Sequence, residues 1–405
     1  MGARAKTLML VEERAREIFK RYSVNEIRIP LLERIELYAR ATGETSDVVE
    51  KQMYSFSDRD EAETTLALRP EGTPGVVRAY IEAGLDRSDP EQRFFYSGPM
   101  FRRERPQKGR YRQFYQFGVE VFGRADPASD VELMVMIDDL RRDLGLKLTT
   151  EINSLGCADC RPAFRAALLA YGRAHLAELC EDCHARLERN PLRLLDCKID
   201  VRLAEAAPKS SDYLCEACRK HFEQVRRLLD SSNVPYAFNP RLVRGLDYYT
   251  RTAFEVVSTD VGAQGSVAAG GRYDALVETL GGAAVPGTGF AIGLDRITLA
   301  VEATREETPL AATAAVVPIG DTATERALWI ARELRTGGLR TELLSAERKL
   351  KTNLQRADKI GARFAIIVGE NELQRGVAQL RDLKKSEQRE IPLDRLVTEV
   401  NGSGR

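Results

Sequence analysis

Several features common to other protein classes are missing from the sequence. Its 61 basic and 61 acidic residues cancel, so no overall field attracts anionic partners, and a nucleic-acid site would need a local basic patch. No apolar run reaches the roughly 18 residues of a membrane helix, and residues 1–22 lack the uninterrupted apolar stretch of a signal peptide. We therefore expect a soluble, cytoplasmic protein with no membrane partner.

A disulfide framework is also missing. The seven cysteines are an odd number, and six of them form three C-x-x-C pairs, a spacing that suits reduced thiols or a metal site. The sequence shows no internal repeat and no low-complexity tail. At 405 residues the chain is long enough for two or three domains.

Changes in hydrophobic pattern divide the chain into three parts. Apolar residues at three- and four-residue steps predict an amphipathic helix over residues 6–22, followed by a strand over residues 26–29 and further strands to Gly123. All seven cysteines and all three histidines lie near residues 157–235 among helix-forming residues, which predicts a helical insertion. Strand and helix then alternate towards the C-terminus, as in a small α/β domain with a largely parallel sheet. We expect an α+β fold with a main domain of residues 1–152 and 236–306, a cysteine-rich insertion of residues 153–235 and a C-terminal domain of residues 311–405.

The predicted strand over residues 114–122 has one polar face. Period-two alternation places Gln116, Gly118 and Glu120 on that face. The opposite face carries the apolar residues Tyr115, Phe117, Val119 and Val121. A glycine between two hydrogen-bonding side chains leaves a floor on which a small polar ligand could lie. A half-solvated face with a bulge glycine explains the same pattern.

A basic segment lies directly upstream, over residues 101–112. Six basic residues and one acid give it a local charge of +5, and Pro106 and Gly109 mark its middle as a hairpin loop. Arginines on strands beside such a loop suit a cleft that grips phosphates while an RNA end is touched from above. A solvated run of charge is the alternative.

Three further segments contribute polar groups. Residues 69–73 form a turn with a carboxylate at Glu71 and a hydroxyl at Thr73, and residues 243–250 carry an arginine and two tyrosines. Each of these two segments alone could be a structural turn. Over residues 287–296 a glycine-rich strand leads into a helix, without the patterns of a P-loop or a Rossmann site.

Together these segments resemble class II aminoacyl-tRNA synthetases, and in particular the histidyl-tRNA synthetase family. The strand ending at Pro30 is similar to motif 1, residues 101–123 to motif 2 and residues 287–296 to motif 3. Residues 242–249 and 269–274 are similar to signatures peculiar to the histidine enzyme. Family members carry a short strand before the first helix, for which this sequence has six residues, and they do not generally have a cysteine-rich insertion.

The resemblance implies a fold, an activity and partners. The fold would be a class II antiparallel-sheet catalytic domain with a helical insertion and a C-terminal α/β anticodon-binding domain. As a histidine–tRNA ligase, the protein would use ATP with Mg²⁺ to form histidyl-adenylate and then transfer histidine to the 3′ end of tRNA(His). Motif 1 implies a homodimer. A noncatalytic histidine-binding regulatory paralogue and an RNA-binding module without catalysis are the alternative functions.

The resemblance also assigns roles to residues. The histidine site would comprise Glu71, Thr73, Gln116, Glu120, Arg244, Leu246, Tyr248 and Tyr249, with the imidazole held by Glu120 and Tyr249. The ATP site would comprise Arg102, Glu104, Arg110, Phe114 and Arg296. Arg102 and Arg244 would converge on the α-phosphate, and Gln116 would share the catalytic centre.

Contacts with tRNA are expected in two places. Arg105 and Gln107 of the basic loop would meet the acceptor end. In the C-terminal domain, the five basic residues Arg348, Lys349, Lys351, Arg356 and Lys359 outnumber the two acids Glu347 and Asp358, a local charge of +3. An ordinary solvated helix explains this second patch equally well.

The cysteines of the insertion offer enough thiolates for a tetrahedral structural zinc site. Two C-x-x-C pairs are the preferred ligands: Cys180 with Cys183, and Cys215 with Cys218. Buried or surface thiols on helices are the alternative. Residues 180–184 also match the c-type haem attachment pattern, which carries little weight without an export signal.

Overall fold

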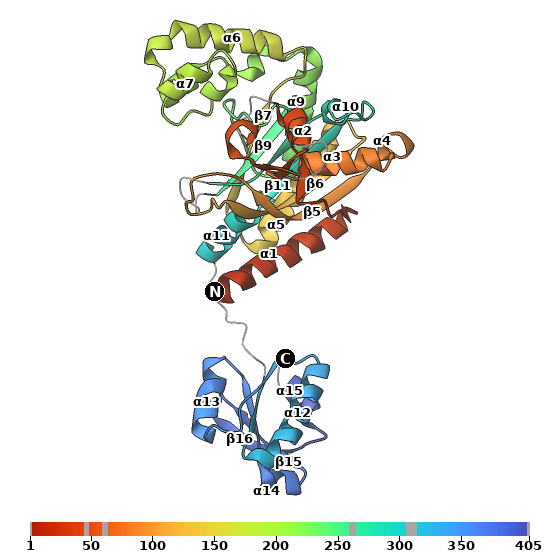
Figure 1. Cartoon of the computed structure of the whole chain (residues 1–405), viewed down its shortest axis with the longest axis vertical. Coiled ribbons are helices and arrows are strands. Elements are labelled where there is room, and N and C mark those ends of the chain that lie inside the picture. Colours follow the sequence, from red (N-terminus) through yellow and green to blue (C-terminus); the bar gives the residue numbers. More distant parts are fainter. Residues whose placement is uncertain (1, 44–47, 59–63, 259–264, 305–313, 403–405) are drawn as a thin grey trace. The chain divides into compact units, whose positions relative to one another are not determined.

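A computed structural model describes residues 2–43, 48–58, 64–258, 265–304 and 314–402. The chain divides into two compact units, residues 1–306 and residues 307–405. Each unit has its own central sheet (Figure 1). Each also has its own apolar core. Among the described residues, no helix has the length and the apolarity needed to cross a membrane.

An eight-stranded sheet forms the centre of the first unit. Its strands follow the order β1-β5-β6-β11-β10-β9-β7-β8. The six inner strands pair antiparallel, and the short edge strands β1 and β8 pair parallel with their neighbours. The bounds are β1 (Asn25–Glu26), β5 (Arg93–Phe101), β6 (Gln113–Phe122), β7 (Leu148–Ser154), β8 (Tyr236–Phe238), β9 (Thr250–Ser258), β10 (Ser266–Arg272) and β11 (Gly287–Gly293). The predicted antiparallel α+β pattern is confirmed, although β1 is shorter than the strand expected over residues 26–29.

One face of this sheet packs against helices and forms the main core. The alternation predicted for β6 is confirmed, because Phe117, Val119 and Val121 are wholly buried on this face. The covering helices are α1 (Gly2–Arg21), α5 (Pro127–Leu144) and α11 (Leu294–Thr304). Phe19 of α1 meets the rings of Phe95 and Phe117 at 5.4 and 6.5 Å between centroids. Burial of this apolar face holds the opposite, polar face of β6 in place.

Local signals at both ends determine the bounds of α5. The Asp126 carboxylate accepts a hydrogen bond from the Ser129 backbone N–H at 3.1 Å, and Pro127 occupies the first helical position. Gly145 ends the helix with φ of +68°, a left-handed conformation that favours glycine. These ends place Asp130, in the first turn, beneath the end of β10.

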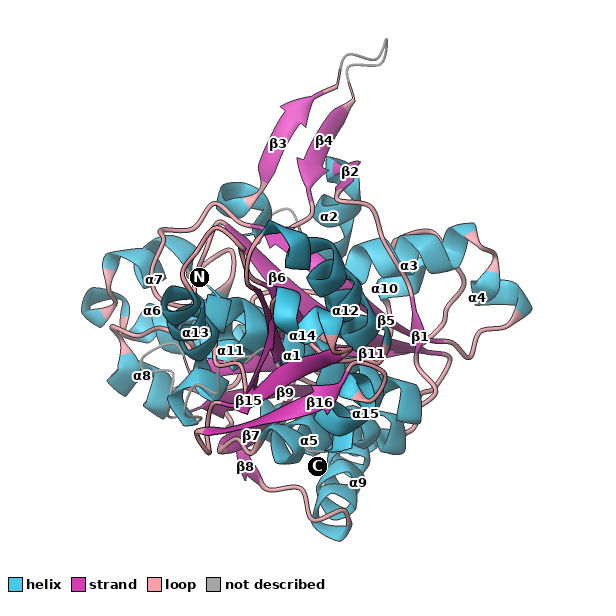
Figure 2. Ribbon diagram, turned by 90° about the horizontal axis from the view of Figure 1, so that it is seen from below, coloured by secondary structure: helices cyan, strands magenta, loops and turns pink. Residues whose placement is uncertain are grey.

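Smaller elements cover the other face. They are α2 (Ile35–Thr42), α3 (Thr73–Glu82), α4 (Leu85–Ser88), α10 (Leu276–Thr279) and a π-helical turn, η1 (Val48–Gln52). A three-stranded sheet of β2 (Leu32–Arg34), β4 (Thr65–Leu68) and β3 (Tyr54–Ser57) adjoins them, and β3 and β4 project as a hairpin in Figure 2. Tyr80 of α3 stacks on Phe122 of β6 at 4.4 Å between centroids.

The segment between β7 and β8 is helical, as predicted. It contains α6 (Arg161–Ala174), η2 (Leu176–Glu178), α7 (Glu181–Arg186), η3 (Pro191–Leu194), α8 (Val201–Ala206), η4 (Ser210–Tyr213) and α9 (Glu216–Ser231). Phe222, Val225 and Leu229 of α9 belong to the main core beside α5. The apolar clusters under the other helices are small.

The second unit contains a five-stranded sheet in the order β13-β12-β14-β15-β16. Its elements are β12 (Ala314–Pro318), η6 (Asp321–Ala323), α12 (Thr324–Thr336), β13 (Thr341–Leu343), α13 (Leu350–Lys359), β14 (Phe364–Val368), α14 (Glu370–Gln374), β15 (Val377–Asp382), β16 (Glu387–Pro392) and α15 (Leu396–Gly402). The sheet is mixed rather than largely parallel, because β15 and β16 form an antiparallel hairpin on the edge of β14. Ser386, in that hairpin's turn, has φ of +58°.

Candidate active site

A cavity of about 890 Å³ lies over the polar face of β6. Its walls come from β6, β10 and β11, from the segment that follows β5 and from the segment that precedes β9. Eleven of the residues predicted from sequence line it: Glu71, Thr73, Arg102, Glu104, Arg110, Phe114, Gln116, Arg244, Leu246, Tyr249 and Arg296. Glu120 and Tyr248 are buried behind the wall, where they bond Thr73 and Glu71.

The glycine in the middle of β6 makes room for a neighbouring ring. A side chain at Gly118 would overlap the Tyr96 ring on the adjacent strand β5. Strand β6 pairs in unbroken register with both β5 and β11, so the alternative of a bulge glycine is wrong. The floor is therefore flat and closely packed below the cavity.

Glu120 is wholly buried at the end of this floor. Its carboxylate accepts a hydrogen bond from Thr73 Oγ1 at 2.6 Å and another from the Tyr273 hydroxyl. Burial raises the pKa of Glu120 to about 8, against the effect of the two hydroxyls, and the nearby Glu71 raises it further. A side chain at Gly289 would overlap the Glu120 carboxylate, which requires glycine there.

Glu71 is the second buried acid at the cavity. Its Oε2 accepts a hydrogen bond from the Tyr248 hydroxyl at 2.8 Å. Burial raises the pKa of Glu71, while Tyr248, Arg102 and Arg244 act in the opposite direction. Two buried acids side by side favour a ligand that brings hydrogen-bond donors or positive charge.

Two of the four cavity arginines are oriented by backbone carbonyl groups. Arg102 Nε donates to the Pro70 carbonyl at 2.9 Å, and its guanidinium lies 5.4 Å from the centre of the Phe114 ring. Arg296 Nε donates to the Gly109 carbonyl at 3.0 Å. Carbonyl groups orient these cations without neutralising them, so their charge remains available to an anion.

The other two arginines have weak ionic neighbours. Arg110 Nε lies 3.6 Å from Glu104 Oε2, and Arg244 Nη1 lies 4.0 Å from a Glu255 carboxylate oxygen.

Burial lowers the pKa of Arg296, and repulsion from Arg110 and Arg102 lowers it further, although Glu104 opposes them. An anionic ligand would relieve this repulsion.

Four buried polar atoms of the cavity have no hydrogen-bond partner in the described part of the chain: Glu71 Oε1, Arg110 Nε, Gln116 Oε1 and Arg244 Nε. Unpaired buried polar atoms are costly in a protein interior. Two of these atoms are acceptors and two are donors, which suits a ligand carrying both an ammonium group and an anionic group.

Comparison with known proteins agrees with this geometry. The family described as histidyl-tRNA synthetase matches residues 2–297, and the anticodon binding domain family matches residues 313–402. The chain is 46% identical over 392 residues to a histidine–tRNA ligase of Desulforamulus reducens, covering 96% of this chain and 93% of that protein. It is 47% identical over 395 residues to that of Anaeromyxobacter dehalogenans, covering 97% and 95%. The apo structure of S. aureus histidyl-tRNA synthetase superposes with a TM-score of 0.80 at 34% identity, covering 98% of this chain and 96% of that one.

The chain belongs to the histidyl-tRNA synthetase family. Its C-terminal unit, which was expected to be an anticodon-binding domain, matches that domain family. The regulatory alternative is not favoured, because relatives with ligase names match over nearly their whole length.

Two residues of the family signature over residues 269–274 have separate structural roles. Arg272 is wholly buried and pairs with Asp130 at 2.6 Å and with Asp274 at 2.9 Å. Tyr273 bonds Glu120. Neither role was predicted, because the signature was used to assign the family rather than to place side chains. The sequence does contain a signal for these two roles. Residues 272 and 273 are adjacent at the end of a strand, and adjacent side chains of a strand point to opposite faces of the sheet.

The expected tRNA contacts are exposed. Arg105 and Gln107 lie in the hairpin loop, where the Gln107 N–H donates to the Arg110 carbonyl at 3.0 Å. Arg348 and Lys349 are exposed before α13. Exposure permits binding, but no contact among the described residues of either unit identifies an RNA surface.

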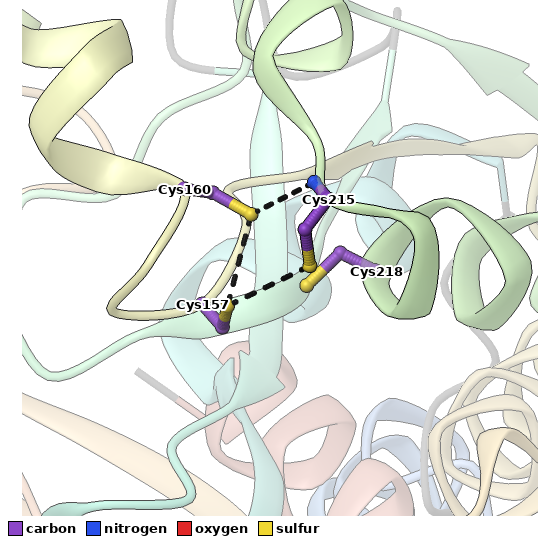
Figure 3. A group of neighbouring side chains, drawn as sticks. All are labelled: Cys157, Cys160, Cys215 and Cys218. Carbon is purple, nitrogen blue, oxygen red and sulfur yellow. Dashed lines mark hydrogen bonds between the residues drawn. The ribbon is translucent and has the colours of Figure 1, made fainter.

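The preferred zinc ligands do not lie together, which corrects the sequence-based prediction. Cys215 and Cys218, at the start of α9, face Cys157 and Cys160 (Figure 3). Cys180 and Cys183, at the start of α7, face Cys197 and Asp200 instead. C-x-x-C spacing identifies each pair but not the pair opposite, which the fold of the insertion determines.

Proposed function

We propose that the protein is a histidine–tRNA ligase. It would join histidine to the AMP part of ATP to form histidyl-adenylate, and would then transfer histidine to tRNA(His). The observation that carries the proposal is the cavity, where the buried acid Glu71 lies beside four arginines and a second buried acid, Glu120, lies behind the wall. Such a site can hold a cationic amino acid and a polyphosphate at the same time. Family membership over nearly the whole chain supports the same activity.

The proposed histidine site uses the acids and the floor of the cavity. The amino group would donate to Glu71, Gln116 and Thr73, since Glu71 Oε1 and Gln116 Oε1 are unpaired acceptors. Neutral imidazole has one donor nitrogen and one acceptor nitrogen, so it can pair with the Glu120 carboxylate and the Tyr249 hydroxyl. A site of this kind rejects ligands that leave its polar groups unpaired, by about 10⁴ or more.

The wall around the histidine amino-group site would be completed by Leu246 and Tyr248. Leu246 lines the cavity, and Tyr248 holds Glu71 through its hydroxyl at 2.8 Å. Tyr248 would therefore position an acid rather than touch the ligand.

The proposed ATP site uses the arginines. Arg102 and Arg244 would bind the α-phosphate, and Arg110 and Arg296 the outer phosphates of ATP with its Mg²⁺. Phe114 would stack on adenine, with Glu104 at the edge of the base. These four guanidinium groups all line one cavity, and Arg296 gains from a neutralising anion because its neighbours repel it.

The first reaction would be an in-line displacement at the α-phosphorus. A carboxylate oxygen of histidine forms the new phosphorus–oxygen bond as the bond to the β-phosphate oxygen breaks and pyrophosphate leaves. Arg102 and Arg244 would stabilise the charge that develops on the α-phosphate oxygens, and Gln116 would keep the histidine amino group in position. In the second reaction, the 3′ hydroxyl of tRNA attacks the carbonyl carbon and AMP leaves.

The proposed tRNA and dimer contacts lie outside the cavity. Arg105 and Gln107 would meet the acceptor end, and Arg348 and Lys349 the anticodon side. A homodimer would form around the segment ending at Pro30, next to which Leu31 and Leu32 are 42% and 44% exposed. The protein would act in the cytoplasm.

Exchange of pyrophosphate with ATP tests the activity across all twenty amino acids. We expect exchange with histidine and none above background with the others. Arg244→Ala should reduce histidine-dependent exchange by roughly 10²–10³-fold or more, because it removes a donor from the site of developing charge.

The matched control for this variant is Arg241→Ala, three residues upstream. Arg241 lies 3.6 Å from a Glu205 carboxylate and outside the cavity, so this variant should exchange at the normal rate. Normal exchange by Arg244→Ala, with an unchanged melting temperature, would refute the assignment. Histidine binding by the wild type without any exchange would favour the regulatory alternative.

A further inference from the structure

Two separate groups of four ligand atoms lie in the insertion. The first joins Cys157 and Cys160, which precede α6, to Cys215 and Cys218, at the start of α9 (Figure 3). All four sulfur atoms lie within 4.8 Å of one another. Cys157 Sγ is 3.7 Å from Cys160 Sγ and 3.9 Å from Cys215 Sγ.

The local backbone is shaped for this first group. Gly156 has φ of +69°, and a side chain there would approach the Cys160 Cβ to 2.5 Å. The Cys215 N–H donates to Cys160 Sγ at 3.1 Å, which links the two pairs. Cys160 and Cys218 are buried, with 4% and 1% exposure.

The second group has three thiols and a carboxylate. Cys180 and Cys183, at the start of α7, face Cys197 and Asp200, and the four ligand atoms again lie within 4.8 Å of one another. Cys180 Sγ is 3.8 Å from Cys197 Sγ. The Cys183 N–H points to Cys180 Sγ at 3.5 Å, and the Asp200 N–H points to Cys197 Sγ at 3.3 Å.

These distances agree with tetrahedral zinc. A zinc–sulfur bond of about 2.3 Å in tetrahedral geometry separates neighbouring sulfur atoms by about 3.8 Å. Disulfide sulfur atoms lie about 2.05 Å apart, and all seven cysteines of the chain are free. The sulfur–sulfur distances of 3.7, 3.9 and 3.8 Å fall at the spacing of the metal site.

Few apolar side chains surround the two ligand groups themselves, although Phe164, Leu168, Leu195, Ala207 and Val243 form a larger cluster beside them. The apolar cluster around the first group contains Leu214 beside its cysteines, and that around the second contains Leu194 and Leu203. Short helices with so small a core rarely stay folded without a metal or a disulfide.

We propose that the insertion binds two structural zinc ions, one at Cys157, Cys160, Cys215 and Cys218 and the other at Cys180, Cys183, Cys197 and Asp200. The first ion ties the two ends of the insertion together, at the connection between β7 and α6 and at the start of α9. The second ion ties α7 to α8 within the insertion. Neither ion touches the cavity, so both roles are structural.

The first ion also lies beside a segment that lines the cavity. Arg161, next to Cys160, donates to the Asp247 carbonyl at 3.1 Å, and the Arg251 N–H donates to the Gly156 carbonyl at 2.8 Å. Val243 packs with Phe164 and Leu168 of this part of the insertion. The first ion therefore supports the segment that carries Arg244 and Tyr249.

Metal analysis of the purified full-length chain tests the proposal directly. We expect two zinc ions per chain, measured by elemental analysis and by the mass of the intact folded protein. Cys218→Ser should lose the ion of the first site and keep that of the second. Asp200→Asn should lose the ion of the second site, or bind it more weakly, and keep that of the first. The variant with both changes should retain neither.

A matched control and a second probe separate the two sites. Asp182→Asn changes an acid of α7 whose side chain is 74% exposed, and it should keep both ions. After replacement of zinc by Co²⁺, Cys218→Ser should remove the bands of a four-thiolate site and leave those of a three-thiolate site. Asp200→Asn should leave the four-thiolate bands unchanged.

Several results would overturn the proposal. They are fewer than two zinc ions on the wild-type chain, iron in place of zinc, disulfides, and seven thiols that react freely in the folded protein. Retention of both ions by Cys218→Ser would also overturn it. Any of these results can occur with normal histidine-dependent pyrophosphate exchange, so failure of the zinc sites is distinguishable from failure of the proposed activity.

Discussion

Two buried carboxyl groups in the first unit have opposite surroundings. Asp130 accepts hydrogen bonds from Arg272 at 2.6 Å and contacts His221 Nε2 at 2.8 Å, whereas Glu120 accepts hydrogen bonds from the hydroxyls of Thr73 and Tyr273. Burial alone would raise the pKa of Asp130, but His221 and Arg272 hold it below its usual value. Burial raises the pKa of Glu120 to about 8.

The difference separates a group that stabilises the fold from one that is available to a ligand. Arg272 and Tyr273 are adjacent in sequence, and the first neutralises Asp130 while the second only bonds Glu120. A buried acid paired with a cation inside the chain has its charge compensated on folding. A buried acid held by hydroxyls beside a cavity has a perturbed pKa, which is typical of functional sites.

The largest effect on stability is expected at the paired acid. Arg272→Met leaves the charge of Asp130 buried beside a histidine alone, and it should lower the free energy of unfolding by about 3–5 kcal/mol. Urea unfolding followed by circular dichroism measures this change. The variant Arg272→Met with Asp130→Asn should recover part of the loss, because the uncompensated charge is gone.

An exposed ion pair provides the control. Arg173 and Glu188 contact each other at 2.7 Å with 60% exposure of each side chain, so Arg173→Met should cost far less stability than Arg272→Met. Equal losses in Arg272→Met and Arg173→Met would show that burial does not distinguish the two pairs.

Replacement of Glu120, which is held by hydroxyls rather than by a cation, should affect ligand binding more than stability. Glu120→Gln keeps the shape of the side chain and removes its ability to ionise, so near pH 5, where the buried carboxyl of the wild type is neutral, we expect stability within about 1 kcal/mol of the wild type. Histidine affinity should fall by about 10- to 100-fold, which corresponds to the roughly 1.5–3 kcal/mol of a hydrogen bond to a charged group. Calorimetric titration with histidine measures the change, and unchanged affinity would remove Glu120 from the proposed site.

The pH dependence of stability distinguishes the two acids further. The folded pKa of Glu120, about 8, lies above its ordinary value, so its contribution to stability is complete at low pH. That contribution is lost as pH rises towards about 8, by at most ~1.4 kcal/mol per pH unit for one proton. Asp130 behaves oppositely, since its folded pKa is lowered and its contribution is lost as pH falls.

Subtracting the stability of Glu120→Gln from that of the wild type, at pH values between about 5 and 9, isolates this contribution. The difference should fall as pH rises and become constant above about pH 8. A difference that rises with pH would mean that the folded state favours the ionised carboxylate.

Much of the candidate site could be predicted from the sequence, because the segments that carry it resemble motifs of the family. Alternation along β6 correctly separated Phe117 and Val119 from Gln116. The pairing of Arg272 with Asp130 could not be predicted, since the two residues are 142 positions apart and no local pattern predicts a fully buried arginine.

The prediction that Cys180 and Cys183 lie with Cys215 and Cys218 was wrong for the same physical reason. Each C-x-x-C pair is formed by a local turn. The ligands that each pair meets depend on how η2, η3 and the helices of the insertion pack against one another. The mixed sheet of the second unit was also missed, because β16, with a single buried residue, lacks the alternation that would reveal a hairpin. Long-range contact, rather than local pattern, decided the first two cases, whereas the hairpin is a local contact that the sequence pattern does not reveal.

The smallest effect of a substitution is expected at two basic side chains that remain exposed to water. Arg348 and Lys349 are exposed before α13, so no desolvation strengthens their field, in contrast to the arginines of the cavity. Replacing both with alanine should weaken tRNA binding by less than about 1 kcal/mol per residue and reduce the salt dependence of log K by roughly one per lost phosphate contact. Filter binding at several salt concentrations measures both quantities, with Arg381→Ala on strand β15 as a basic control in the same unit. Equal slopes in the double variant and the wild type would place the RNA contact elsewhere, and a loss beyond about 3 kcal/mol would show that binding buries these two charges as deeply as the fold buries Arg272.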